Sequence, residues 1–330
     1  MDKYSLSLVD LADLLGITRQ AVAQMALKLE IQGASVVKNK KHITHLNPLT
    51  VRDVLSSRGY KYQNKIFAFQ VIKGGVGKTT IAKNFGIRAA QYGYKVLFVD
   101  FDHQANLTFA LDKFNPSNKV FVDFIRGSVN KVSDLVLKIS SNISIIPSSL
   151  TNARLDSELL TNAFNLSSVI KDPLEELRKN YDLIVCDCPP ALGPTVSSIY
   201  LAVDQVIAPV VPDKFSEMAI DFMFEEWKIL TQRFKSTPVI KLLINRHDPR
   251  LKTSNEQLVH IVSKYKEYIY PTAIRSSADF ITSTNMSKHV WEGKKISVAS
   301  EDVDLFVRHA LGLSELTETK NNKKEMSVDV

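Results

Sequence analysis

A short glycine-rich segment, KGGVGKTT at positions 73–80, constrains the fold of this 330-residue chain more than any other stretch. It follows the apolar, β-prone run KIFAFQVI and precedes the helical pattern TTIAKNFGIRAAQYG, which stops at Gly93. Glycines allow backbone N–H groups to close on phosphate oxygens, and the positive N-terminal end of a helix adds to that attraction. The order of strand, glycine loop, lysine, hydroxyl and helix therefore predicts a site for nucleotide phosphates, and argues against a glycine-rich turn without function.

The loop nevertheless departs from the common phosphate-loop pattern G-x-x-x-x-G-K-[ST]. That pattern requires a glycine five residues before Gly77, where Ile72 stands, and a second lysine, Lys73, follows at once. The remaining groups are in place, since Lys78 can reach the β and γ phosphates and Thr79 can hold Mg²⁺. The predicted nucleotide-binding residues of the loop are Lys73, Gly74, Gly75, Val76, Gly77, Lys78, Thr79 and Thr80.

Two further apolar runs end in aspartates that complete such a site. YDLIVCDCPP reads as a strand that ends at Asp187, and VLFVDFDHQANLT as a strand that ends with Asp100 and Asp102, two residues apart. Acidic residues at the ends of strands beside a phosphate loop can hold Mg²⁺, often through water, and can orient an attacking water. Thr79, Asp187 and Asp100 are the predicted metal-site residues.

Most of the chain alternates short apolar strands with helical segments. KVLFVD, ISIIP, YDLIVCD, QVIAPV and PVIKLLIN are buried-strand patterns, and helical patterns lie between most of them. Near-continuous apolar strands separated by helices predict an α/β fold with a mostly parallel sheet covered on both faces. We therefore expect one large domain over residues 66–311, followed by a polar, disordered tail over 312–330.

KGGVGKTT, VDFDHQAN and DCPP together resemble the deviant Walker A ATPases, and among them the ParA-type partition ATPases. The resemblance extends from about Lys65 to Leu311. It implies weak ATP hydrolysis with ATP and Mg²⁺ as cofactors, in a homodimer that sandwiches two ATP molecules. It also implies that Lys73 reaches across the two-fold interface to the partner's nucleotide, that Asp102 orients the attacking water, and that Asn245 contacts adenine. Lys73, Lys78 and Asp102 are thus the predicted catalytic residues.

One residue departs from the family pattern, which usually reads D-P-Q-[GA]-N. His103 stands in place of the proline, directly after Asp102. A histidine at this position could titrate near neutral pH beside the water-orienting aspartate. A substitution that the loop simply tolerates is the alternative.

Residues 1–60 have a different pattern, which predicts a winged helix-turn-helix domain joined through a linker at 61–65. In LADLLGITRQAVAQM, Ala12 permits close helix crossing, Gly16 permits the turn, and Val22 and Met25 can pack the second helix on the first. The start of a recognition helix reads base edges, and a basic hairpin can act as a wing on phosphates. The predicted DNA-binding residues here are Thr18, Arg19, Gln20 and Gln24 on the helix and Lys38, Lys40 and Lys41 on the hairpin.

The charge distribution agrees with a polyanionic partner for this N-terminal part. Residues 1–65 contain ten Lys or Arg and five Asp or Glu, which accounts for +5 of the net charge of +7. A helical dimerisation domain is the alternative. The resemblance implies that the N-terminal domain binds the protein's own operator, as it does in the larger ParA-type proteins. It further implies nonspecific DNA binding through Arg275 in PTAIRSSADF, where the proline usual before that arginine is absent.

The resemblance as a whole implies an ATP-driven DNA-partition protein with a ParB-like centromere-binding partner that stimulates hydrolysis. A transcriptional repressor whose ATPase tunes DNA binding is the main alternative. A cell-division-site regulator of the MinD kind would need an amphipathic membrane helix, and TETKNNKKEMSVDV has no apolar face. An iron–sulfur reductase would need more cysteines than Cys186 and Cys188. We expect a cytoplasmic, nucleoid-associated protein without a membrane partner.

Overall fold

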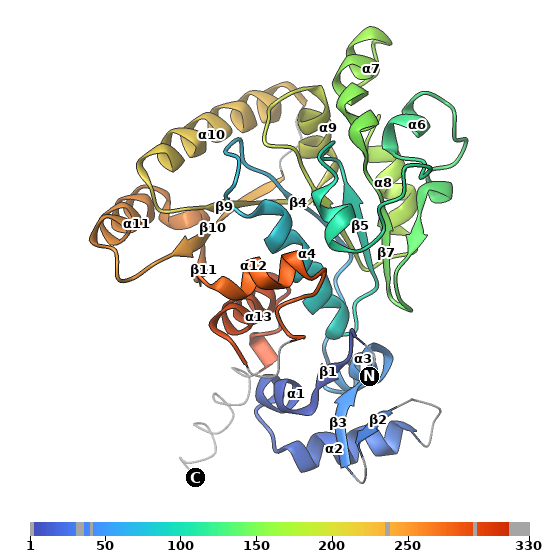
Figure 1. The fold of residues 1–330 in the computed structure, drawn as a ribbon, viewed down its shortest axis with the longest axis vertical. Helices are drawn as coiled ribbons and strands as arrows, with labels where there is room; N and C mark the ends of the chain where they lie inside the picture. The colour runs from blue at the N-terminus through green and yellow to red at the C-terminus, as the bar shows by residue number, and fades with distance from the viewer. Residues whose placement is uncertain (1–2, 31–35, 40–41, 235–237, 293–295, 317–330) are drawn as a thin grey trace.

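An eight-stranded sheet forms the centre of the larger of two packed units (Figure 1). The computed structural model describes residues 3–30, 36–39, 42–234, 238–292 and 296–316. The strand order is β11-β10-β9-β4-β8-β5-β7-β6, and every pair is parallel except β6 with β7. The strands are β4 (Lys65–Phe69), β5 (Val96–Asp100), β6 (Leu137–Lys138), β7 (Ile143–Ile146), β8 (Leu183–Asp187), β9 (Gln205–Val210), β10 (Val239–His247) and β11 (Ile269–Arg275). The predicted α/β fold with a mostly parallel sheet is confirmed.

Helices cover both faces of the sheet. Alternate residues along each strand point to opposite faces, so each strand contributes to two apolar clusters. In β4, Phe67 and Phe69 join one apolar cluster, and Ile66 and Ala68 join the other. The first cluster includes residues of α4 and α13, and the second includes residues of α8, α9, α10 and α11. The longer helices of this unit are α4 (Lys78–Gln91), α8 (Lys171–Arg178), α9 (Pro194–Ala202), α10 (Lys214–Phe234), α11 (Lys252–Tyr265), α12 (Ala278–Asn285) and α13 (Val298–Ala310). The shorter ones are α5 (Asn106–Ala110), α6 (Phe121–Ile125), α7 (Leu155–Thr161) and the 3₁₀ turns η1 (Val132–Leu135), η2 (Leu150–Arg154) and η3 (Lys266–Tyr268).

Helix α4 follows the glycine loop and lies directly against the sheet. Gly86 permits this close approach, because a Cβ at its position would lie 2.3 Å from the ring of Phe98. Within the described residues, none of the helices is both long and apolar enough to span a membrane.

In the described residues of the smaller, N-terminal unit, three helices pack with a three-stranded antiparallel sheet. Helix α1 (Leu8–Leu15) ends at Gly16, whose φ of 57° is left-handed, and α2 (Arg19–Glu30) begins with the Thr18 hydroxyl accepting a hydrogen bond from the Ala21 N–H at 3.2 Å. The turn at Gly16 agrees with the sequence prediction, and the Thr18 hydroxyl caps the start of the second helix. The remaining elements are β1 (Leu6–Ser7), β2 (Val36–Asn39), β3 (His42–Leu46) and α3 (Pro48–Ser57).

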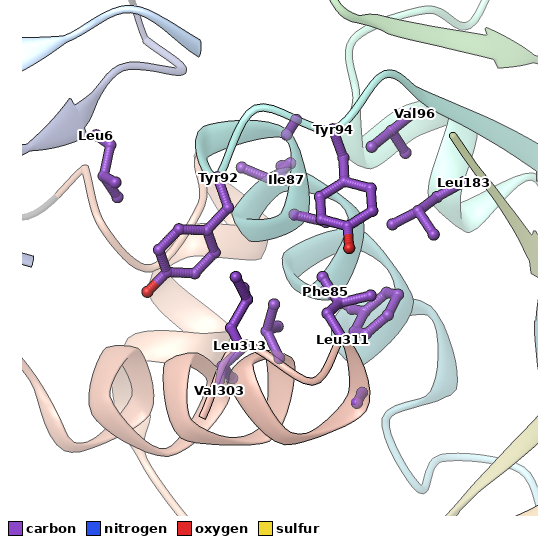
Figure 2. Packing of buried hydrophobic residues seen from close by; sticks show 14 of the residues in the cluster. Leu6, Phe85, Ile87, Tyr92, Tyr94, Val96, Leu183, Val303, Leu311 and Leu313 are labelled. Atoms are coloured by element: carbon purple, nitrogen blue, oxygen red, sulfur yellow. The ribbon is translucent and has the colours of Figure 1, made fainter. Parts of the chain in front are cut away.

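The N-terminal unit packs on the far end of α4, the helix that begins at the glycine loop (Figure 1). Figure 2 shows Leu6 of β1 together with Tyr92, Leu313 and Val303 of the larger unit, all members of one continuous apolar cluster. The two units therefore share part of their hydrophobic core.

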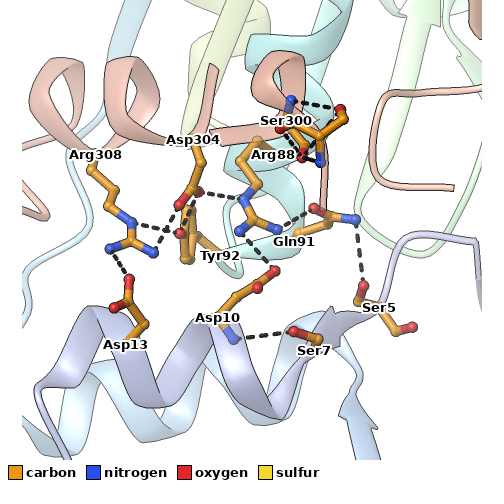
Figure 3. A network of polar contacts seen from close by, with 11 residues as sticks. Ser5, Ser7, Asp10, Asp13, Arg88, Gln91, Tyr92, Ser300, Asp304 and Arg308 are labelled. Atoms are coloured by element: carbon orange, nitrogen blue, oxygen red, sulfur yellow. Dashed lines mark hydrogen bonds and ion pairs between the residues drawn. The ribbon is translucent and has the colours of Figure 1, made fainter. Parts of the chain in front are cut away.

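A buried polar network crosses the same boundary (Figure 3). The guanidinium of Arg88, only 2% exposed, donates through Nε to Asp304 of α13 at 2.5 Å and through Nη2 to Asp10 of α1 at 2.9 Å. Arg308 likewise joins Asp304 to Asp13 of α1, at 2.7 and 2.8 Å. A buried charge requires paired, hydrogen-bonded partners, and here they come from both units.

The segment that joins the two units, around Tyr60 and Tyr62, packs against the larger unit. Tyr60 and Tyr62 donate from their hydroxyls to the carbonyls of Leu311 and Tyr92, both at 2.7 Å. The described chain extends past the expected boundary at 312: Leu313 is fully buried, and the description reaches residue 316. The predicted tail from 317 onward lies outside the described residues.

We predict that Asp304→Asn destabilises the fold strongly. Removing one member of a buried ion pair typically costs roughly 3–5 kcal/mol, and here it would leave Arg88 with Asp10 and Arg308 with Asp13 as their remaining acidic partners. Asp248→Asn is the matched control, because its partner Arg250 has a side chain 85% exposed and such surface pairs contribute little to stability. Urea unfolding measures both, and equal losses would contradict the prediction.

The pH dependence of stability follows from the same carboxylate. Burial alone would raise the pKa of Asp304, but Arg88 and Arg308 outweigh it and hold the pKa below its ordinary value. A depressed folded pKa means that the stabilisation is present above the unfolded pKa of about 3.9 and is lost as pH falls through the folded value.

Candidate nucleotide-binding site

The glycine loop lies where the carboxyl ends of three neighbouring parallel strands meet. It joins β4 to α4, and β8 and β5 follow β4 in the sheet. The register aligns Phe69 with Asp187 and Asp187 with Asp100, so the two aspartates end adjacent strands beside the loop. This edge of an open α/β sheet is where ligands bind.

Two glycines give the loop a shape that other residues would resist. Gly75 and Gly77 have φ angles of 72° and 91°, in the left-handed region that glycine adopts freely. A Cβ on Gly77 would in addition lie 2.7 Å from the Nδ2 atom of Asn245. The loop therefore requires glycine at position 77 for both conformation and space.

Lys78 is nearly buried at the start of α4. Its side chain donates from Nζ to the carbonyl of Lys73 at 3.2 Å. Burial lowers the pKa of Lys78, and the charges of Asp187 and Asp102 oppose that shift. The ammonium thus lies between the glycine loop and the aspartates. This is the position from which a loop lysine reaches the phosphates of a nucleotide.

The environment of Asp187 suits a carboxylate that binds a cation. Both of its side-chain oxygens are buried and have no hydrogen-bond partner among the described residues. Burial and the charge of Asp100 raise the pKa of Asp187 well above its usual range, while nearby Thr79 and Lys78 lower it in part. Unpartnered buried oxygens beside a hydroxyl fit Mg²⁺, which takes one or two protein ligands and completes its shell with phosphate and water. In the described part of the chain, no group of three His, Cys, Asp or Glu residues could hold a metal alone.

Asp100 holds the loop that follows β5. Its oxygens accept hydrogen bonds from the Asp102 N–H at 3.2 Å and from the N–H and hydroxyl of Thr108 at 2.9 and 2.6 Å. Burial raises the pKa of Asp100 to about 7. A contribution of Asp100 to the metal shell stays a prediction.

Asp102 is 5% exposed, and its Oδ1 accepts a hydrogen bond from the Gln104 N–H at 3.0 Å. The ring of His103 is half-exposed, with Nδ1 lying 3.8 Å from Asp102 Oδ1, beyond hydrogen-bonding distance. The structure thus brings Asp102 to the same edge as Lys78 and Asp187, and keeps His103 beside it without a direct bond.

Lys73 contacts residues outside its own loop. Its ammonium pairs with Asp213, and its Nζ lies 3.4 Å from the hydroxyl of Ser216 at the start of α10. Burial alone would raise the pKa of Asp213, but the hydrogen bond and charge of Lys73 hold it below the usual value. Sequence reasoning missed Asp213: the pattern D-x-x-S after an apolar strand predicts a helix start, but not a lysine partner.

Asn245 and Arg275, both predicted to bind ligands, are engaged within the protein. Asn245 is 3% exposed and donates from Nδ2 to the carbonyl of Val76 at 2.7 Å. Arg275 donates from Nε and Nη2 to the carboxylate of Asp302 at 2.9 and 2.6 Å. Their roles toward adenine and DNA stay predictions.

The predicted DNA-binding residues of the N-terminal unit lie on its surface where the structure describes their side chains. Thr18 and the first residues of α2 are exposed, and Lys38 is part of β2. Lys40 and Lys41 lie outside the described residues. The exposed set is Thr18, Arg19, Gln20 and Gln24.

Comparisons with known proteins place this site in a described family. The family model described as an AAA domain matches residues 64–240, more than half of the chain. The chain is 25% identical over 248 residues to the cell division protein PomZ of Myxococcus xanthus, covering 74% of this chain and 76% of that protein. It is 27% identical over 213 residues to the sporulation initiation inhibitor protein Soj of Bacillus subtilis, covering 64% and 83%.

A solved structure agrees with the fold. Apo McdA of Cyanothece superposes with a TM-score of 0.67 at 25% identity, covering 75% of this chain and 99% of that one. An aspartate-to-alanine variant of McdA in complex with ATP gives a TM-score of 0.69 at 24% identity, covering 77% and 98%. The matched family model begins at residue 64, so the N-terminal unit lies outside it.

We predict that Asp102→Ala retains ATP binding and loses hydrolysis. The aspartate is required mainly to orient water on the way to the transition state, so its loss lowers the turnover rate without weakening the ground state. Titration calorimetry with ATP and release of phosphate measure the two properties. Lys78→Ala should instead abolish binding, because the phosphates lose their buried cation; wild-type turnover in Asp102→Ala would show that another group orients the water.

Proposed function

Because the chain belongs to the AAA domain family of ParA/MinD-type P-loop ATPases, we propose that it is an ATP-dependent DNA-partition protein. ATP binding joins two copies into a dimer that binds DNA, and slow hydrolysis to ADP and phosphate releases it. The arrangement of Lys73 carries this proposal: its ammonium pairs with Asp213, which lies outside the phosphate loop, and would have to leave that acid to reach the nucleotide of a partner.

The proposed chemistry assigns one role to each group at the strand ends. Lys78 and the loop N–H groups bind the phosphates, and Thr79 and Asp187 would hold Mg²⁺, which neutralises charge on the β and γ phosphates. Asp102 orients a water. The oxygen of that water would bond to the γ phosphorus as the bond between the γ phosphorus and the β–γ bridging oxygen breaks, and one proton of the water would pass to an oxygen of the released phosphate. Charge stabilisation and positioning supply most of the catalysis in phosphoryl transfer.

Two surfaces are proposed for DNA. The exposed start of α2 would read a specific operator, which would let the protein autoregulate its operon, with Lys38, Lys40 and Lys41 on the backbone. Arg275 would contribute to nonspecific binding by the dimer and would have to leave Asp302 to do so. A ParB-like centromere-binding protein is the proposed activator of hydrolysis, and a nucleoid-associated location in the cytoplasm follows.

An ATP-modulated repressor without a partition role is the second candidate, favoured by the exposure of Thr18, Arg19, Gln20 and Gln24 together. Removing the N-terminal unit would not separate the two functions cleanly, because that unit shares its core with α4 and α13. Point variants in the full chain are therefore the appropriate test. A repressor should lose all DNA binding when α2 is altered, whereas a partition protein should keep its nonspecific, ATP-dependent binding.

Lys73 tests the dimer. If Lys73 contacts the partner's nucleotide, Lys73→Ala should bind ATP almost normally and fail to dimerise. Two symmetric contacts, each about 1.5–3 kcal/mol for a charge-assisted bond, amount to roughly 3–6 kcal/mol of dimer stability, more than a hundredfold in dissociation constant. Light scattering with ATP and Mg²⁺ on the Asp102→Ala background isolates the effect from hydrolysis.

Lys252→Ala is the matched control for Lys73, because its side chain is 90% exposed and pairs with Glu256 on the surface. In the Asp102→Ala background, Lys252→Ala should dimerise on ATP as Asp102→Ala alone does. A Lys73→Ala, Asp102→Ala protein that still dimerises on ATP would exclude the contact across the interface. A weakened ATP affinity with normal dimerisation would mean that Lys73 serves its own subunit.

The N-terminal unit should bind a specific site in DNA near its own gene. Arg19→Ala and Gln20→Ala should each reduce discrimination between sequences by about 1–3 kcal/mol for every base pair that the side chain reads. Lys40→Ala should weaken binding to all sequences and flatten the dependence on salt. Arg58→Ala removes an exposed charge at the end of α3 and controls for net charge. Equal effects of Arg19→Ala and Arg58→Ala on sequence preference would favour a dimerisation domain.

A further inference from the structure

Strand β10 contains an extra residue where it passes the glycine loop. Its register with β11 pairs Ile244 with Ala273 and His247 with Arg275, so three steps along β10 correspond to two along β11. Such a bulge re-aims side chains and is frequent beside active sites. Arg246 lies in it with a φ of 53°, a left-handed conformation that arginine rarely adopts.

The bulge directs two consecutive side chains at two consecutive carbonyls of the loop. Asn245 donates from Nδ2 to the Val76 carbonyl at 2.7 Å, and Arg246 donates from Nη1 to the Gly75 carbonyl at 2.9 Å. The first side chain is buried and the second is exposed. The end of β10 is thus hydrogen-bonded to two consecutive carbonyls of the phosphate loop.

These two bonds also determine where the loop's N–H groups point. In a trans peptide the carbonyl and the N–H of one unit face opposite ways. Holding the Gly75 carbonyl therefore turns the Val76 N–H away from β10, and holding the Val76 carbonyl does the same for the Gly77 N–H. Neither N–H donates to a protein acceptor within the described residues. Loop N–H groups of this kind bind the α and β phosphates of a nucleotide.

Arg246 adds charge as well as geometry. Among the described residues it forms no ion pair, and the acid two positions later, Asp248, is held by Arg250 at 2.7 Å. A guanidinium keeps its charge at any physiological pH, and its remaining donors can attract a diphosphate group. This attraction should grow with each phosphate added.

We propose that Arg246 is a positioning residue of the nucleotide site, which orients the Val76 N–H and favours nucleotides that carry a β phosphate. The proposal rests on the proposed function. It accounts for the left-handed backbone, because the bulge aims the arginine at Gly75, where a regular strand would point it elsewhere.

The test compares Arg246→Gly with Arg250→Ala in the full chain. Glycine adopts the left-handed conformation without strain, so Arg246→Gly removes the guanidinium and leaves the backbone relaxed. Calorimetry should show ADP and ATP binding weakened by about tenfold, which corresponds to about 1.4 kcal/mol. AMP affinity, measured by competition, should fall less, because AMP lacks the β phosphate, and the thermal midpoint without nucleotide should stay as in the wild type. Arg250→Ala should change none of these, and Arg246→Lys, which keeps the charge, should recover part of the loss.

Three outcomes would overturn the proposal. Wild-type ADP affinity in Arg246→Gly would show that the hydrogen bond to Gly75 does not matter for binding. An equal loss for AMP and ADP would indicate a general structural effect rather than phosphate positioning. Lys78→Ala, measured in parallel, separates a failure of this inference from a failure of the proposed function. If Lys78→Ala loses ADP binding while Arg246→Gly keeps it, only the inference about Arg246 fails. A wild-type chain that binds no nucleotide would overturn the proposed function and this inference together.

Discussion

The buried guanidinium of Arg88 is the contact on which the arrangement of the two units depends. It lies near the end of α4 and has one acidic partner in each unit, Asp304 and Asp10. A charge this deeply buried is stable only with both its hydrogen bonds and its counter-charges in place. The N-terminal unit is therefore part of the environment that α4 requires, and the apolar cluster around Tyr92 extends the same contact.

Helix α4 connects that contact to the nucleotide site. It begins at Lys78, where its N-terminal end faces the phosphates, and reaches Arg88 within the same rigid helix. Its packing on the sheet is close because Gly86 has no side chain to separate it from Phe98. The proposed ATP site and the proposed DNA-binding unit thus lie at opposite ends of one element.

The chemistry of the site arises from the ends of parallel strands. Asp100 and Asp187 are brought level by the register of β5 and β8, and burial raises the pKa of both. Their surroundings nevertheless differ. Asp100 accepts three hydrogen bonds from Thr108 and Asp102, whereas Asp187 has buried oxygens without partners among the described residues. The same residue type therefore supports the loop in one strand and suits a cation in the next.

Local patterns in the sequence determined the elements and the outline of the site. Apolar strands, the glycine loop, the Gly16 helix stop and the Thr18 cap are short-range features, and short-range physics is sufficient to predict them. Lys78, Asp187 and Asp102 could be predicted together because parallel strands end at a common edge. The tertiary structure alone decided the contacts between distant segments: Lys73 with Asp213, Arg275 with Asp302, Arg88 with Asp10, and the bulge that places Arg246 on Gly75. Such pairs depend on how strands and helices align in space. The residues next to each partner in the sequence do not specify that alignment.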